Sequence, residues 1–111
     1  EVVEESLPTL IERVFLLGKQ YNKISWQELL VRVCETIVLK NPYKIATMGA
    51  SDSTKNGNNY TLTLDGKQKE PCQKLSNGFY VYMGGSNNEI RTRCEHILSA
   101  CGFSINELQI L

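Results

Sequence analysis

Two serines, each followed three residues later by a glutamate, constrain the fold of this chain more than any other feature. They are Ser25 with Glu28 and Ser86 with Glu89, and an amphipathic run of residues follows each pair. In such a capping box, the serine oxygen and the glutamate carboxylate satisfy backbone N–H groups that would otherwise lack a partner at a helix start. The sequence therefore predicts two amphipathic helices, one beginning after each serine.

Both predicted helices also have clear ends. The first is expected over residues 26–39, and it stops before Pro42 because proline disfavours helical backbone in the preceding residue. The second is expected over residues 87–101 and is followed by Gly102, which easily adopts the left-handed conformation found after helix C-termini. These are the two most strongly predicted elements of the chain.

Strand patterns lie between and after these helices. Residues 60–64 alternate apolar and polar side chains and precede the turn pair Asp65-Gly66. Residues 79–83 are rich in aromatic and β-branched side chains, which favour strands. The apolar, alternating residues 108–111 also predict a packed strand, because an apolar terminus rarely remains exposed.

The segment before the first helix admits two interpretations. Apolar residues between positions 7 and 17 recur at helical spacing, whereas residues 13–24 fit two strands around a Gly18-Lys19 turn. We favour a helical or irregular start to about Glu12, followed by the hairpin. The order hairpin, helix, strands, helix, strand predicts an α+β domain in which two capped helices pack on a small, mostly antiparallel sheet.

Length and composition restrict the class of protein. The 111 residues are 41% apolar and 22% charged with no net charge, which is typical of one globular domain and not of a disordered tail. No apolar run approaches the roughly 20 residues that a membrane-spanning helix needs, so no membrane partner is predicted. Residues 49–59 show no apolar periodicity, and we expect a mobile loop there.

The N-terminus gives an expectation about cellular context. The chain begins with Glu1, and residues 1–5 are acidic, unlike the basic and then apolar start of a signal peptide. We expect a cytoplasmic location. We also expect residues 1–111 to be a single domain that forms the C-terminal module of a longer chain.

The cysteines do not form a metal-binding pattern. Cys34, Cys94 and Cys101 occupy apolar positions of the predicted helices, where free cysteine behaves as a small apolar residue. His96 lies two residues from Cys94, and side chains at that spacing point to different sides of a helix. We therefore expect buried, reduced thiols at the three helical positions, and predict neither a metal nor a cofactor.

Basic residues are concentrated in the middle of the chain. Residues 40–93 contain eight Lys and Arg residues against four Asp and Glu residues. A local excess of positive charge favours contacts with phosphates, and tyrosines stack on unpaired bases. The residues predicted to bind nucleic acid are Lys55, Lys67, Lys69, Lys74, Arg91, Arg93, Tyr60 and Tyr82. The competing interpretation is an ordinary solvated face, which the near-neutral pI of 6.9 favours.

A glycine-containing turn precedes the second predicted helix. Gly84, Gly85 and Ser86 lie where backbone N–H groups and the positive end of a helix converge, an arrangement that suits an anion. The segment matches neither common nucleotide-binding motif. The glycines alternatively serve only to form the turn before the Ser86 cap.

Several segments resemble a known but poorly characterised domain. They are Phe-Leu-Leu-Gly-Lys-Gln-Tyr from residue 15, Ile-Ser-Trp-Gln-Glu-Leu-Leu from residue 24, Leu-Ser-Asn-Gly-Phe-Tyr-Val-Tyr from residue 75 and the Gly-Gly-Ser-Asn-Asn-Glu-Ile turn from residue 84. Over residues 13–111 the chain resembles small α+β accessory domains at the C-terminal end of larger bacterial proteins of the restriction or phage-defence type. The resemblance includes no catalytic residues.

Three classes of function remain as expectations. The first is a non-catalytic accessory module that contacts DNA or RNA. The second is a protein-interaction or oligomerisation module that uses the open edge of the C-terminal strand to bind another domain of the parent protein or a second copy. The third, an enzyme that acts on a phosphorylated small molecule at Gly84 and Gly85, has least support, because no convergent acid and base are visible.

Overall fold

The computed structural model describes residues 10–53, 62–63 and 71–111, with only the backbone described for residues 49–53 and 62–63. The described chain has the predicted α+β architecture. Its elements in chain order are β1 (Leu10–Leu16), β2 (Lys19–Ser25), α1 (Trp26–Lys40), α2 (Pro42–Ser53), β3 (Leu62–Thr63), β4 (Cys72–Lys74), β5 (Tyr80–Tyr82), α3 (Asn87–Ala100), the 3-10 helix η1 (Ile105–Glu107) and β6 (Leu108–Ile110).

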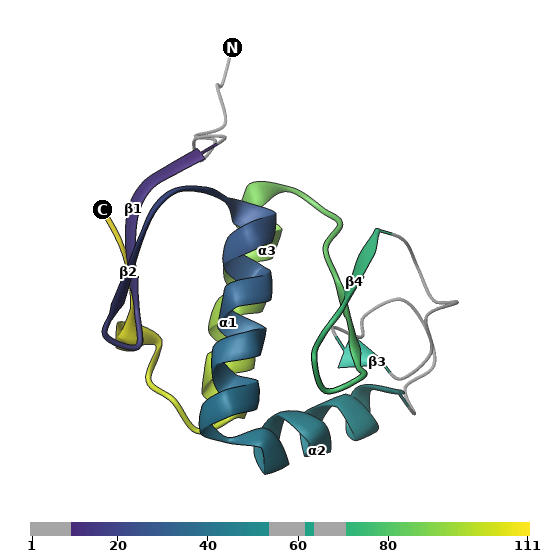
Figure 1. Ribbon diagram of the computed structural model, residues 1–111. Helices are drawn as coiled ribbons and strands as arrows, with labels where there is room; N and C mark the ends of the chain where they lie inside the picture. Colours follow the sequence, from purple (N-terminus) through teal and green to yellow (C-terminus); the bar gives the residue numbers. More distant parts are fainter. Residues whose placement is uncertain (1–9, 54–61, 64–70) are drawn as a thin grey trace.

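The strands form two small sheets, which we name sheet A and sheet B. Sheet A has the order β2-β1-β6 and sheet B the order β3-β5-β4, and every described pair is antiparallel. The helices α1 and α3 lie side by side between the two sheets (Figure 1). The expectation of one sheet is therefore corrected, because strands at the two ends of the chain pair with each other and leave the middle strands to form a sheet of their own.

The hairpin interpretation of the N-terminal region is confirmed, but the turn lies at Leu17-Gly18, one residue earlier than the predicted Gly18-Lys19, because Leu16 pairs with Lys19. Leu17 and Gly18 both have positive φ angles, of 50° and 85°, as in the two-residue turns whose twist matches that of the flanking strands. Strand β1 begins at Leu10, so the expectation of a helical or irregular start to about Glu12 is wrong for residues 10–12. Residues 1–9 lie outside the described part of the chain.

The ends of α3 follow the predicted pattern closely. Ser86 Oγ accepts a hydrogen bond from the backbone N–H of Glu89, and the Glu89 carboxylate accepts one from the N–H of Ser86. At the other end, Gly102 has a φ of 88°, and the backbone N–H of Phe103 donates to the carbonyl of Leu98 over 2.9 Å. This is the Schellman arrangement expected where a glycine follows a helix.

Helix α2 is not predicted by the sequence pattern. Proline ends α1 as expected but then occupies the first position of α2, where its missing N–H costs nothing. Asn41 links the two helices, because its N–H donates to the carbonyl of Ile37 and its side-chain oxygen accepts from the N–H of Lys44. The predicted loop over residues 49–59 is consequently wrong for residues 49–53, which are helical. Residues 54–59 are not described.

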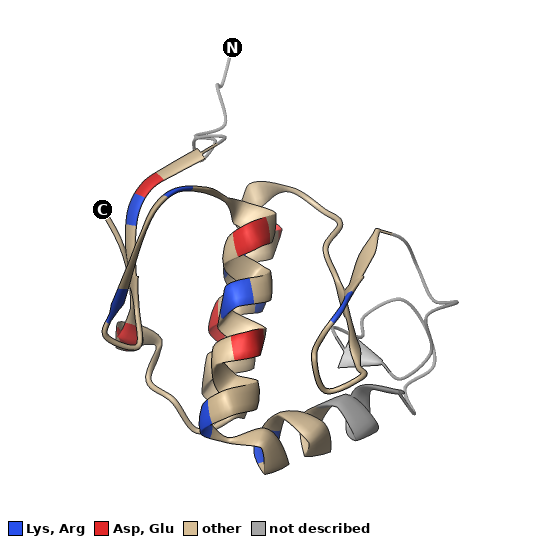
Figure 2. Cartoon of the chain, in the orientation of Figure 1, with Lys and Arg blue, Asp and Glu red and all other residues tan. Residues whose placement is uncertain are grey.

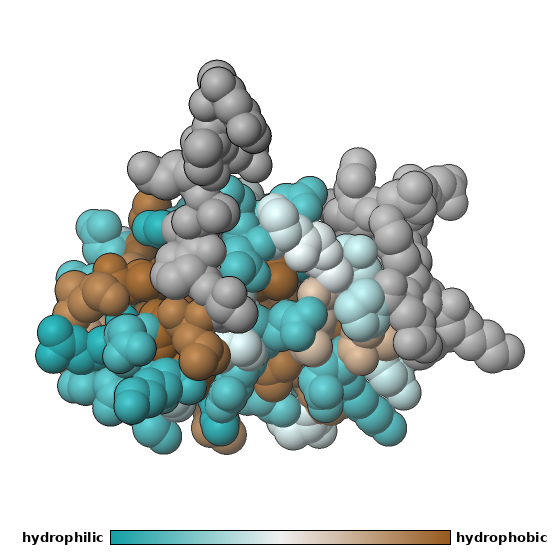
Figure 3. Space-filling model, turned by 90° about the horizontal axis from the view of Figure 1, so that it is seen from above, coloured by the Kyte–Doolittle hydropathy of each residue, from teal (hydrophilic) through white to brown (hydrophobic). Residues whose placement is uncertain are grey.

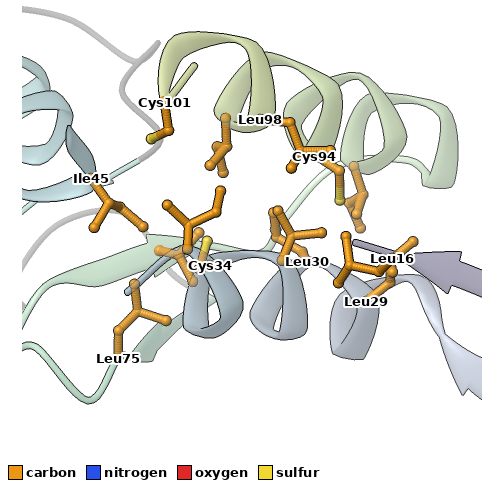
Figure 4. Packing of buried hydrophobic residues seen from close by; sticks show 14 of the residues in the cluster. Leu16, Leu29, Leu30, Cys34, Ile45, Leu75, Cys94, Leu98 and Cys101 are labelled. Atoms are coloured by element: carbon orange, nitrogen blue, oxygen red, sulfur yellow. The ribbon is translucent and has the colours of Figure 1, made fainter. Parts of the chain in front are cut away.

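A continuous apolar core joins the helix layer to both sheets. Sheet A contributes side chains such as Val14, sheet B contributes Val81, and the turn between β4 and β5 contributes Leu75. Figure 4 shows the facing apolar surfaces of α1 and α3, with Cys34 directed from α1 toward α3. The predicted burial of Cys34, Cys94 and Cys101 is confirmed, and all four cysteines are free thiols. Among the described helices, none combines the length and apolar character needed to cross a membrane.

Candidate nucleic-acid interface

The strongest candidate surface is the outer face of sheet B, which is the face opposite to the buried side chain of Val81. Val81 is fully buried, so its neighbours Tyr80 and Tyr82 point to the opposite face of β5. Both tyrosines are half-buried. Lys74 lies directly opposite Tyr80 in the β4–β5 ladder, and Cys72 lies opposite Tyr82. Strand pairing thus brings an exposed lysine and two tyrosines onto one small surface.

Arg93 extends this surface from the side of α3. Its guanidinium donates to the backbone carbonyls of Tyr82 at 3.3 Å and Gly84 at 3.0 Å. The same group lies 4.9 Å from the centre of the Tyr82 ring, which is within the range of a cation–π interaction. In the described part of the chain, no carboxylate forms a salt bridge with Arg93. Its positive charge is therefore held beside Tyr82 without being neutralised by a described acid.

Arg91 has a different environment. Its Nε atom lies 3.6 Å from a carboxylate oxygen of Glu95, one helical turn along α3, and both side chains are partly exposed. Positions two residues apart on a helix point to different sides, which separates Arg91 from Arg93. The two arginines therefore do not act together in the described structure, and Arg93 is the one that contacts sheet B.

The other predicted contact residues fall outside the described ranges. They are Lys55, Lys67, Lys69 and Tyr60. Across the described chain, basic and acidic residues are interspersed on α1 and sheet A, whereas β4 carries Lys74 alone (Figure 2). The described charges thus form no broad basic surface, and the cationic part of the candidate interface is limited to Lys74 and Arg93.

The glycine turn before α3 has its own internal anion. The Glu89 carboxylate accepts the N–H of Ser86 at 2.7 Å, so it occupies a position at which an external anion would bind. Both glycines are explained by close packing. A Cβ atom at Gly84 would collide with the Tyr82 ring, and one at Gly85, where φ is 99°, would lie 2.8 Å from the Glu89 carboxylate. This geometry favours the interpretation that Gly84, Gly85 and Ser86 form a turn and a cap.

The described titratable groups do not converge on a reaction centre. His96 is exposed on α3, and no cluster of three or more His, Cys, Asp or Glu residues suited to a metal ion occurs within the described ranges. Burial raises the pKa of Cys34, and it raises the pKa of Cys94 to about 12. Burial also raises the pKa of Cys101, although the nearby Lys44 opposes the increase. These three thiols are protonated at neutral pH and are poor nucleophiles.

Tyr80 lies on the candidate interface, although it is not among the residues predicted from the sequence to bind nucleic acid. Lys74 and Tyr80 are each three residues from Asn77 in the β4–β5 turn, so a hairpin centred there places them opposite each other. This signal depends on recognising β4. The residues Cys72, Gln73 and Lys74 have little strand propensity and show no apolar alternation, so their sequence alone does not indicate a strand.

Comparison of the chain with protein-family models, with curated proteins and with solved structures finds no match.

Proposed function

We propose that this chain is a non-catalytic accessory module that binds single-stranded nucleic acid through the outer face of sheet B. The observation that carries the proposal is the grouping of Tyr80 and Tyr82 on one face of β5, with Lys74 opposite and the Arg93 guanidinium beside the Tyr82 ring. Small antiparallel sheets with exposed aromatic residues bind unpaired bases by stacking, while nearby cations contact the phosphates.

The charge of the chain favours a single strand over a duplex. Twelve basic and twelve acidic residues leave no net charge, so few counterions would be released on contact with a long duplex backbone. Stacking on an aromatic side chain stabilises the complex by about 1–3 kcal/mol per base and requires few cations. A surface with two tyrosines and two positive groups therefore suits a short, unpaired stretch. Contacts from Lys55, Lys67, Lys69 and Tyr60 remain predictions.

Fluorescence anisotropy with labelled single-stranded DNA and RNA, titrated at several salt concentrations, tests the proposal. We expect weak binding whose affinity falls with salt, with a logarithmic slope of about 0.7 for each phosphate contact. Tyr80→Leu should weaken binding by about 5- to 150-fold, which corresponds to the stabilisation lost with one stacked base. Lys74→Gln should reduce the logarithmic salt slope by about 0.7, which is the value expected for the loss of one phosphate contact.

Two variants serve as matched controls. Tyr43→Leu removes a tyrosine that is 77% exposed on α2, away from the candidate interface, and Lys44→Gln removes a cation from the same helix. Neither should change affinity or salt slope. The proposal fails if the unmodified protein shows no salt-dependent binding to either nucleic acid, or if Tyr43→Leu weakens binding as much as Tyr80→Leu does.

A further inference from the structure

The two edges of sheet A differ in how well they are protected against pairing with another strand. The β2 edge carries Lys19 and Lys23, and Lys23 has a positive φ of 53° that interrupts regular strand geometry. Charged side chains and local distortion are the usual means by which proteins block an exposed strand edge. At the opposite edge, β6 has the sequence Leu-Gln-Ile and contains no charge. Of the two described edge strands of sheet A, only β6 lacks these protections against further pairing.

The hydrogen bonds between β1 and β6 show which backbone groups remain available. Leu17 N–H donates to the Glu107 carbonyl at 2.9 Å, and Leu111 N–H donates to the Arg13 carbonyl at 3.0 Å. Backbone groups alternate in direction along an antiparallel strand, so Gln109 directs its groups toward β1. Those of Leu108 and Ile110 consequently point outward from the sheet edge.

One of these outward backbone groups already forms a hydrogen bond within the chain. The N–H of Leu108 donates to the carbonyl of Ile105 in η1. The carbonyl of Leu108 and both backbone groups of Ile110 have no described protein partner. An approaching strand can therefore form one donor and one acceptor contact with Ile110 and a further acceptor contact with Leu108, as in strand addition.

From this geometry we propose that β6 pairs antiparallel with β6 of a second copy of the chain. In the proposed register, Leu108 of each copy pairs with Ile110 of the other, and Gln109 lies at the twofold axis. The outward N–H of Ile110 then donates to the outward carbonyl of Leu108 in both directions. The product is a continuous six-stranded sheet with the order β2-β1-β6 repeated in reverse.

The chemistry of the β6 edge favours a second copy as the partner. A twofold interface must be self-complementary, because each residue at the axis faces its own duplicate. Gln109 meets this condition, since a primary amide both donates and accepts hydrogen bonds and bears no charge. Lysine or glutamate at this position would face a like charge, which destabilises directly opposed strand residues.

The surroundings of β6 also include exposed apolar surface. Leu111, immediately after β6, is 61% exposed, and Ile105 before it is 51% exposed. Apolar residues gather on the sheet A side of the molecule in Figure 3. A three-residue edge nevertheless buries little area, so we expect a weak, concentration-dependent dimer.

Analytical ultracentrifugation of charge variants at Gln109 tests this proposal. The unmodified protein should rise from its monomer mass of 12.5 kDa toward twice that value with increasing concentration. Gln109→Lys and Gln109→Glu should each remain at the monomer mass when alone. An equimolar mixture of the two variants should associate at least as well as the unmodified protein, because opposite charges then meet at the axis.

Gln20 provides a closely matched control. It lies opposite Phe15 in β1, as Gln109 does from the other side, so both glutamines occupy the same row of sheet A. Gln20→Lys should leave self-association unchanged. The proposal is overturned if the unmodified protein remains monomeric up to about 1 mM, where even weak interfaces associate. Loss of association in Gln20→Lys, or a Lys–Glu mixture that stays monomeric, also overturns it. Far-ultraviolet circular dichroism verifies that each variant is folded.

Discussion

Glu35 on α1 accepts two hydrogen bonds from Ser76, which lies 41 residues later in the turn between β4 and β5. The backbone N–H of Ser76 is 3.0 Å from one carboxylate oxygen, and its hydroxyl is 2.6 Å from the other. At the N-terminal end of α1, Gln27 donates to the carbonyl of Met83 at 3.1 Å. Two polar contacts, one near each end of sheet B, thus attach this sheet to the helix layer.

Removing the Glu35 carboxylate should loosen sheet B. Hydrogen bonds to a charged group stabilise folded proteins by about 1.5–3 kcal/mol when they are shielded from water, and less when exposed as here. We expect Glu35→Ala to lower the free energy of unfolding by about 1 kcal/mol in urea titrations. Glu95→Ala, which breaks an exposed salt bridge with Arg91, is the control and should cost less than about 0.5 kcal/mol.

A double-mutant cycle identifies the Ser76 contribution. The effects of Glu35→Ala and Ser76→Ala should not be additive, because both changes remove the same hydroxyl–carboxylate contact. Additive effects would contradict the direct contact between the two side chains.

The four cysteines should differ sharply in reactivity toward a thiol reagent such as dithionitrobenzoate. Cys34, Cys94 and Cys101 are buried in the core, whereas Cys72 on β4 is partly exposed. We expect one thiol to react rapidly in the native protein and three more only after unfolding in guanidinium chloride. Cys72→Ser should abolish the rapid phase. A native protein in which two or more thiols react rapidly would contradict the packing between α1 and α3.

Stability should fall in alkaline solution through the titration of Cys94. Burial raises its pKa from 9.0 to about 12 in the folded chain. Above pH 9, the unfolded chain therefore releases a proton that the folded chain retains, so the equilibrium shifts toward the unfolded state. The stabilising contribution of the neutral thiol is complete below pH 9 and is lost progressively between pH 9 and about 12.

Urea titrations at pH 8.5 and 10.5 measure this loss. For one thiol that is ionised in the unfolded chain and neutral in the folded chain, the free energy of unfolding falls by about 1.4 kcal/mol per pH unit. At pH 8.5, Cys94→Ala should be less stable than the unmodified protein, because removing the sulfur atom leaves a cavity. Between pH 8.5 and 10.5, however, its free energy of unfolding should decrease less than that of the unmodified protein. Equal losses for the variant and the unmodified protein would contradict a contribution from Cys94 and would leave the effect to the other two buried thiols, Cys34 and Cys101.

Gly84→Ala should disturb the position of Tyr82. A Cβ atom at this buried site would overlap the Tyr82 ring, so either the ring or the turn must move. Overpacking of this kind costs about 1–3 kcal/mol. Gly102→Ala is a useful comparison, because nothing lies within 4 Å of the added atom and only its positive φ opposes the change.

A second substitution tests whether the overlap between the Cβ atom added at Gly84 and the Tyr82 ring causes the loss of stability. In a Tyr82→Ala background, Gly84→Ala should cost much less stability, since the ring that blocks the Cβ atom is gone. An unchanged cost in that background would contradict the contact between Gly84 and Tyr82.

Local signals in the amino-acid sequence are sufficient to predict the elements that depend on neighbouring residues. Ser25 and Ser86 begin helices because their side chains bind backbone groups three residues away. Leu17 and Gly18 form the hairpin turn because two short strands flank a residue that accepts a positive φ. These interactions span few residues, so they are visible without knowledge of the tertiary structure.

The sequence pattern is less informative where structure depends on distant partners. Residues 49–53 lack apolar periodicity but continue α2, whose Ile45 and Met48 join the core. Strand β4 has weak propensity and exists because its backbone pairs with β5. The position of Arg93 beside Tyr82 likewise depends on the hydrogen bonds that its guanidinium donates to the carbonyls of Tyr82 and Gly84, whereas Arg91 on the same helix pairs with Glu95.

The sequence by itself thus determined the α+β class, the two capped helices, the hairpin and the burial of three cysteines, since each follows from residue spacing and burial preference. The tertiary structure alone decided that the strands divide into two sheets, because β1 pairs with β6 almost one hundred residues along the chain. The tertiary structure also decided which basic side chains lie beside the tyrosines of β5. Both outcomes depend on contacts between distant segments, whose free energy is shared by the whole core and is not encoded in any one stretch of residues.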